Sequence, residues 1–172
     1  RLCTQLGSFA GQLTRTGLKG AHITFAGNAA ELNTRPLVAS LLEALLRPIT
    51  DSVNMVNAPL VARERDIDVQ VTTRDRVDGY TTLVTLAVDT ESGTRTVSGT
   101  LVQDAAPRIV GIRGIRMDAE LGPRMLFIRN NDAPGLIGKL GSILGDAQLN
   151  IANFHLGRER AGGEAIALLE VD

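Results

Sequence analysis

Residues 124–156 read RMLFIRNNDAPGLIGKLGSILGDAQLNIANFHL, and this stretch decides the fold of the last third of the chain. A strand-like apolar run, Arg124 to Arg129, meets a polar loop containing Pro and Gly. Apolar residues at helical spacing then predict a helix over Gly135 to Ala147. Two more strand-like apolar runs come after this helix, and a glycine pair separates them. They are Asn150 to Leu156 and Glu164 to Val171. The order predicts a β-α-β-β unit, the first part of a ferredoxin-like fold.

Helices come first and strands later in the residues before this unit. Helical spacing occurs over residues 2–13 and again after Pro36, which suits a first helical turn, and a short helix is expected at 60–65 after a capping Asn57. Period-two alternation predicts strands at 20–25, 67–71, 82–88, 94–102, 108–112 and 115–117, with turns at Asp78-Gly79 and 91–93. This pattern predicts an α+β domain with a mixed or antiparallel sheet and helices on one face.

Gly122-Pro123 is the expected joint between two domains, the first at residues 1–123 and the second at 124–172. Both ends of the chain lie within or directly beside apolar elements. We therefore expect a fragment of a longer polypeptide, in which the last helix and strand of the second domain are missing.

Composition excludes several classes of function. The 172 residues include 18 basic and 19 acidic side chains, and this balance argues against a nucleic-acid or anionic-membrane surface. Cys3 is the single cysteine, so neither a disulfide within the chain nor a thiolate metal site is expected, and no other metal site is expected either. No apolar run reaches membrane-spanning length. The chain is expected to be globular, soluble and cytoplasmic.

The loop Asn130-Asn-Asp-Ala-Pro-Gly135 joins a strand to a helix and contains the strongest candidates for ligand-binding residues. Asp132 is a candidate N-cap, Pro134 suits the first turn, and Gly135 lets a ligand approach free backbone amides. A helix N-terminus binds carboxylates, and the Asp132 carboxylate can hold an ammonium group. The pair suits a zwitterionic amino acid. The alternative is that Asp132 only caps its helix.

Residues 130–153 resemble the first half of an ACT domain, a small regulatory module that binds amino acids at dimer interfaces. Ahead of it, Val56 to Arg65, Val97 to Leu101 and Arg108 to Ile112 resemble the C-terminal half of long-form D-3-phosphoglycerate dehydrogenases. In that family an allosteric substrate-binding domain precedes the ACT domain. The resemblance implies a non-catalytic regulatory and oligomerisation region with no cofactor of its own. The parent would be an NAD-dependent enzyme of L-serine biosynthesis, forming a homodimer or homotetramer.

The same resemblance implies the effector residues. L-serine or a similar amino acid would bind Asn130, Asp132, Pro134 and Gly135, and Asn150 would reach it from the neighbouring subunit. Asn130 replaces the His or Tyr expected there. A second site, for an anion such as a phosphorylated acid, would use the available arginines, while Glu120 replaces another expected cation; these arginines are Arg108, Arg113 and Arg116.

Two alternatives remain open from the sequence. One is the corresponding segment of an iron-sulfur L-serine dehydratase, which also joins this type of domain to an ACT domain. The other is a structural module that holds an oligomer together and binds no ligand. Separately, Gly138, Gly141 and Gly145 predict a flat helix face for close packing. No catalytic residue set emerges from the sequence.

Overall fold

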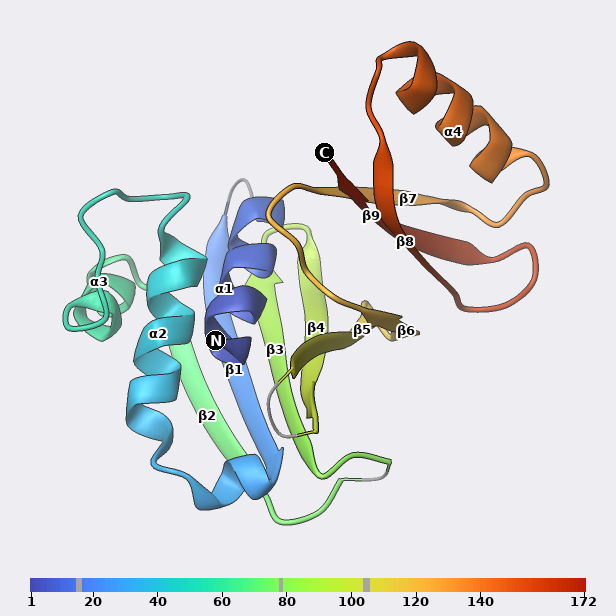
Figure 1. Cartoon of the computed structure of the whole chain (residues 1–172). Coiled ribbons are helices and arrows are strands. Elements are labelled where there is room, and N and C mark those ends of the chain that lie inside the picture. The colour runs from blue at the N-terminus through green and yellow to red at the C-terminus, as the bar shows by residue number, and fades with distance from the viewer. Residues whose placement is uncertain (15–16, 78, 104–105) are drawn as a thin grey trace.

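The computed structural model describes residues 1–14, 17–77, 79–103 and 106–172. It shows an α+β fold with two sheets (Figure 1), as predicted. In the described ranges the first sheet has six strands in the order β2-β1-β3-β4-β5-β6. Their bounds are β1 Leu18–Gly27, β2 Asp68–Arg74, β3 Thr82–Thr90, β4 Gly93–Val102, β5 Ala106–Ile112 and β6 Ile115–Ala119.

An apolar row runs across this sheet and sets its register. Ile23 of β1 lies beside Val71 of β2 on one side and Leu86 of β3 on the other, and the row continues through Val97 of β4 and Ile112 of β5. β1 and β2 are parallel, whereas the other pairs are antiparallel. A parallel pair needs a long crossover, which the helices between β1 and β2 supply. The turn predicted at Asp78-Gly79 falls partly outside the described residues.

The six-stranded sheet and the helices that come before β7 form the first unit. Its helices are α1 (Leu2–Leu13), the short 3-10 helix η1 (Asn28–Glu31), α2 (Thr34–Leu46) and α3 (Ala58–Glu64). α1 and α2 lie side by side over one face of the first sheet (Figure 1). Pro36 lies in the first turn of α2, as predicted. Asn57 occupies the N-cap position of α3, as predicted, but its side chain makes no capping hydrogen bond and instead accepts from the Asn54 amide (2.7 Å).

Two glycines bring α1 and α2 into backbone contact. A Cβ atom added to Gly7 would lie 2.2 Å from the Leu41 carbonyl oxygen, and one added to Gly11 would lie 2.5 Å from that of Leu45. Leu6, Leu41 and Leu45 are fully buried beside this contact. The closely packed helices α1 and α2 therefore cover one side of the first core. The buried Cys3 also belongs to this core.

The second sheet has the predicted β-α-β-β order. It consists of β7 (Met125–Asn131), α4 (Leu136–Asp146), β8 (Ile151–Arg158) and β9 (Glu164–Val171), with the antiparallel strand order β7-β9-β8. On one face, Leu144 of α4 packs against Ala167 and Leu169 of β9. In the described residues nothing lies within 4 Å of a Cβ built on Gly138, Gly141 or Gly145. The predicted close packing at these glycines is therefore wrong, because α4 contacts its sheet through other residues.

The other face of the second sheet is buried against the first unit. Ile166 and Leu168 of β9 belong to the first core, and Met125 and Phe127 of β7 pack against it. The Phe127 ring meets the Phe9 ring of α1 edge to face, with centroids 5.7 Å apart. The two sheets thus share one continuous apolar interior. Among the described helices, none combines the length and the apolar character needed to cross a bilayer.

A pair of helical glycines tests the backbone contact between α1 and α2. Gly7→Ala should lower the free energy of unfolding by about 1–3 kcal/mol, because the new methyl group overlaps the Leu41 carbonyl. Gly138→Ala, the matched control in α4, should raise it by roughly 0.5–1 kcal/mol, because alanine favours a helix and meets open space. Urea denaturation measures both; equal effects of one sign would contradict the predicted contact.

Candidate functional site

Asp132 fastens the loop between β7 and α4 to the turn between β8 and β9. Its Oδ2 atom accepts hydrogen bonds from Arg158 Nη1 (2.8 Å) and from the Gly162 amide (3.3 Å). Its own amide donates to the Gly163 carbonyl (2.8 Å). The hydrogen bond from Arg158, followed by that from Gly162, holds the pKa of the Asp132 carboxyl below its ordinary value. Asp132 therefore does not cap α4, and the predicted capping role is wrong.

Gly135 occupies the N-cap position of α4. Its φ of 88° lies in the left-handed region that favours glycine, and no side chain caps the helix. The helix begins at Leu136, so Pro134 precedes the first turn instead of lying in it. The first amides of α4 have no partner within the helix and carry the positive end of its dipole. These amides can receive a carboxylate.

Asn130, near the end of β7, supplies an unused acceptor. Its Nδ2 donates to the Asn131 carbonyl (2.6 Å), but its Oδ1 is buried and has no hydrogen-bond partner among the described residues. Two residues before it on the same strand, Ile128 packs into the small core under α4, so alternation places Asn130 on the α4 side of the sheet. A buried carboxamide oxygen without a donor fits a ligand that brings one, such as an ammonium or hydroxyl group.

Asn150 lies at the opposite end of the sheet from this loop. Its Nδ2 donates to Asp172 Oδ2 (2.8 Å), just beyond the end of β9, whereas Asp132 bonds to the turn before β9 begins. The eight residues of β9 separate these ends by about 25 Å at strand spacing. One copy of the chain therefore does not bring Asn150 to Asp132, and a common site would need a second copy.

The three predicted anion-binding arginines have different surroundings. Arg108 lies near two carboxylates, those of Asp118 (3.7 Å) and Glu120 (3.8 Å). Arg116 is exposed on β6. Arg113 lies in the turn between β5 and β6 and faces the carboxylate of Glu164 in β9 (3.5 Å). Only Arg113 of the three lines a cavity between the two sheets.

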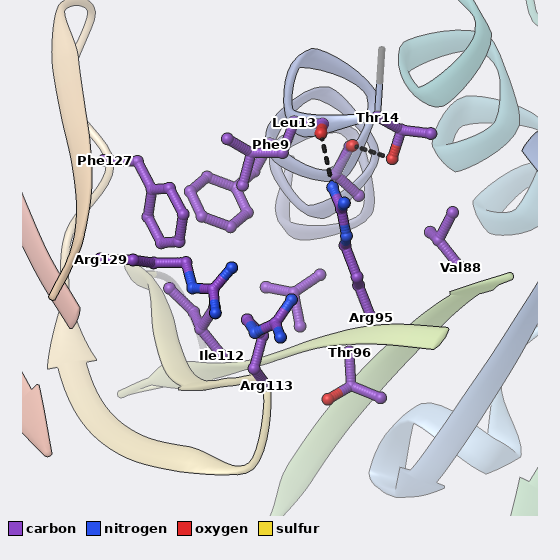
Figure 2. Close-up of a pocket in the computed structure, with 12 residues that line it drawn as sticks. Phe9, Leu13, Thr14, Val88, Arg95, Thr96, Ile112, Arg113, Phe127 and Arg129 are labelled. Carbon is purple, nitrogen blue, oxygen red and sulfur yellow. Dashed lines mark hydrogen bonds between the residues drawn. The ribbon is translucent and has the colours of Figure 1, made fainter. Parts of the chain in front are cut away.

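This cavity has a volume of about 190 Å³ and lies between α1, β4, the β5–β6 turn and β7 (Figure 2). Arg95 and Arg129 line it together with Arg113. Sequence reasoning missed both, because residues from two separated strands, β4 and β7, and from the β5–β6 turn have no common spacing in the sequence. It also missed Arg158 and Glu164 at the edge of the second sheet. Those two could have been found, since antiparallel pairing places the start of β9, where Glu164 lies, beside the end of β7 and beside the end of β8, where Arg158 lies.

The comparisons with known proteins cover the chain from end to end. Residues 1–113 match the family described as the D-3-phosphoglycerate dehydrogenase intervening domain. The D-3-phosphoglycerate dehydrogenase of Bacillus subtilis is 34% identical over 173 residues, which include all of this chain and 33% of the relative. Those of Synechocystis sp. and Mycobacterium tuberculosis are 33% and 32% identical over 174 residues, covering 31% and 33% of their lengths. The chain thus spans about a third of these relatives.

The hydrogen bond between Arg158 and Asp132 predicts a measurable titration. Because the folded-state pKa of Asp132 lies below the unfolded value, the bond contributes stability above the unfolded pKa and loses it as the pH falls through the folded one. Arg158→Gln should move the Asp132 pKa back toward its ordinary value, as followed by NMR of the carboxyl carbon. Arg160→Gln removes a charge from the same turn without removing the bond. An equal shift in both variants would rule out the specific bond.

Proposed function

Because the chain belongs to the family of the D-3-phosphoglycerate dehydrogenase intervening domain, we propose that it is a regulatory region of such a dehydrogenase and binds L-serine or a related amino acid as a feedback effector. The observation that supports effector binding is the β7–α4 loop. There an unpartnered Asn130 oxygen, the Asp132 carboxylate and the open N-terminus of α4 lie at one end of one sheet.

The chemistry of this loop matches both ends of an amino acid. The ammonium group would donate to Asn130 Oδ1 and to the Asp132 carboxylate, whose Oδ2 already has two donors. The carboxylate would accept from the first amides of α4, where the helix dipole favours negative charge. Gly135 at the N-cap position has no side chain to cover these amides, and no side chain of the described residues caps the helix by a hydrogen bond. A neutral amine or a simple carboxylic acid would satisfy only half of this site.

The proposal includes a homo-oligomer, in which Asn150 has the effector-binding role that the resemblance implies. Since this residue lies about 25 Å along β9 from the loop of its own chain, it would complete the site of a second copy. In this proposal the effector binds between two second sheets of a dimer or tetramer. Binding would then favour one arrangement of subunits over another. The first unit would transmit that preference, because it shares an apolar interior with the second sheet.

The catalytic step would take place outside these 172 residues. The parent enzyme would use NAD to oxidise 3-phosphoglycerate in the cytoplasm, as a step of L-serine biosynthesis, while this region would bind no cofactor. The matched family and relatives favour a dehydrogenase over a segment of an iron-sulfur L-serine dehydratase. A structural module without ligand is the second candidate, and the observation in its favour is that Arg158 already pairs with Asp132.

Titration calorimetry with L-serine tests the effector role. The unmodified chain should bind L-serine, and Asp132→Ala should weaken binding about tenfold or more, because a charge-assisted hydrogen bond to the ammonium group is lost. Asp146→Ala, at the other end of α4, should bind as the unmodified chain does. Arg158→Gln should retain binding, because it frees the Asp132 carboxylate. Absence of heat with millimolar L-serine would reject the effector role and leave the structural candidate.

A further inference from the structure

The first sheet ends in an open edge at β2 (Figure 1). This strand pairs with β1 on one side, and among the described residues no strand lies on its other side. Within the same ranges, the backbone of β2 makes no hydrogen bond other than those to β1. Every second residue of such an edge strand points its amide and its carbonyl away from the sheet. These groups can pair with the backbone of another strand.

β2 lacks the features by which proteins usually protect a sheet edge. Its seven residues include no proline and no lysine, and its pairing with β1 runs from Asp68 to Arg74 without a bulge. Register shifts do interrupt the pairings of β1 with β3, of β4 with β5 and of β5 with β6. At the opposite edge of the sheet, β6 packs against β8 of the second sheet. A regular, unprotected edge is typical of a strand that pairs with a partner.

The apolar row across the first sheet is buried up to its last member on β2. Ile23 and Leu86 are inaccessible to water, and Val97 and Ile112 are nearly so. Val71, which continues this row at the edge, is 44% exposed. A strand added beside β2 would cover Val71 and extend the row by a further residue. The side chains of β2 therefore point to the same partner as its backbone does.

The charges of β2 specify which strand fits. Its sequence, Asp68-Val-Gln-Val-Thr-Thr-Arg74, has its acidic residue at one end and its basic residue at the other, and both are exposed. Antiparallel pairing of two copies about Val71 places Asp68 of each copy opposite Arg74 of the other. The same register pairs all seven residues and keeps equivalent side chains on the same face of both sheets. Parallel pairing would place like charges opposite each other, which is destabilising.

From these observations we infer that β2 is an interface with a second copy of this chain. The two β2 strands pair antiparallel, and the first sheets of the two copies join into one continuous sheet. The two-fold axis passes beside Val71, so that each copy contributes the same surface. Two ion pairs between Asp68 and Arg74 fix the register at the two ends of the paired strands.

This interface is separate from the one proposed for the amino-acid effector. It uses the first sheet, whereas Asp132 and Asn150 belong to the second. A chain with two different two-fold interfaces can form a tetramer, whereas either interface alone gives a dimer. The inference does not depend on L-serine binding, so the two proposals can fail independently.

Sedimentation equilibrium of the 172-residue chain without L-serine tests the inference by charge reversal. The unmodified chain should associate reversibly at concentrations up to the millimolar range. Asp68→Arg and Arg74→Asp, each alone, should weaken the association about tenfold or more, because each places like charges opposite each other at both ends of the paired strands. Asp146→Arg, the control in α4, should associate as the unmodified chain does. A chain that stays monomeric, or association that both reversals leave intact, would overturn the inference.

Mixing the two variants separates strand pairing from a folding defect. Equal amounts of Asp68→Arg and Arg74→Asp should regain the association, because each variant supplies the charge that the other needs at the opposite position. The double variant Asp68→Arg/Arg74→Asp should associate with itself for the same reason. Urea denaturation of each variant at low concentration shows whether the chain is folded. If the single variants are folded and neither the mixture nor the double variant regains association, antiparallel pairing through β2 is wrong.

Discussion

The structure depends on one strand that is apolar on both faces. In β9, Ile166 and Leu168 point into the core of the first unit, while Ala167 and Leu169 point under α4, and all four are nearly inaccessible to water. The second sheet has one described helix to cover one of its faces, so its other face must find cover elsewhere. The first unit provides this cover. The geometry of every candidate site near the second sheet follows from that burial.

Strand β7 contributes residues both to the β7–α4 loop and to the cavity between the sheets. Arg129 faces the cavity between the sheets, and the next residue, Asn130, lies on the side of α4. Because successive side chains of a strand point to opposite faces, the proposed amino-acid site and the cavity between the sheets are adjacent along one backbone and separated by the thickness of one sheet. The same strand therefore contributes side chains to both places. A regulatory role would require that ligand binding on one side of β7 changes the contacts on its other side.

Local patterns in the sequence predicted the elements well and their contacts poorly. Period-two alternation located most strands, and the β-α-β-β order predicted the second sheet, because both depend on neighbouring residues. The parallel pairing of β1 with β2 was not predicted, since a long crossover separates the strands. The glycines of α4 were assigned a packing role that belongs to Gly7 and Gly11, because spacing alone does not reveal which helix meets another.

The same distinction between local patterns and tertiary contacts applies to the candidate sites. The loop from Asn130 to Gly135 was found because its residues are consecutive, although the partner of Asp132 was not. The arginine cavity escaped prediction because tertiary packing, and not spacing, brings its members together.

The edge-to-face contact between Phe9 and Phe127 also bears on how such proteins diversify. A gene fusion that replaced the second unit by another β-α-β-β module would have to supply apolar side chains on both faces of its last strand and an aromatic ring for α1. Modules that evolved with a polar outer face would leave the first core open to water. Each unit therefore relies on the other to cover part of its apolar surface, and a boundary that looks clean in the sequence lies beside a shared core.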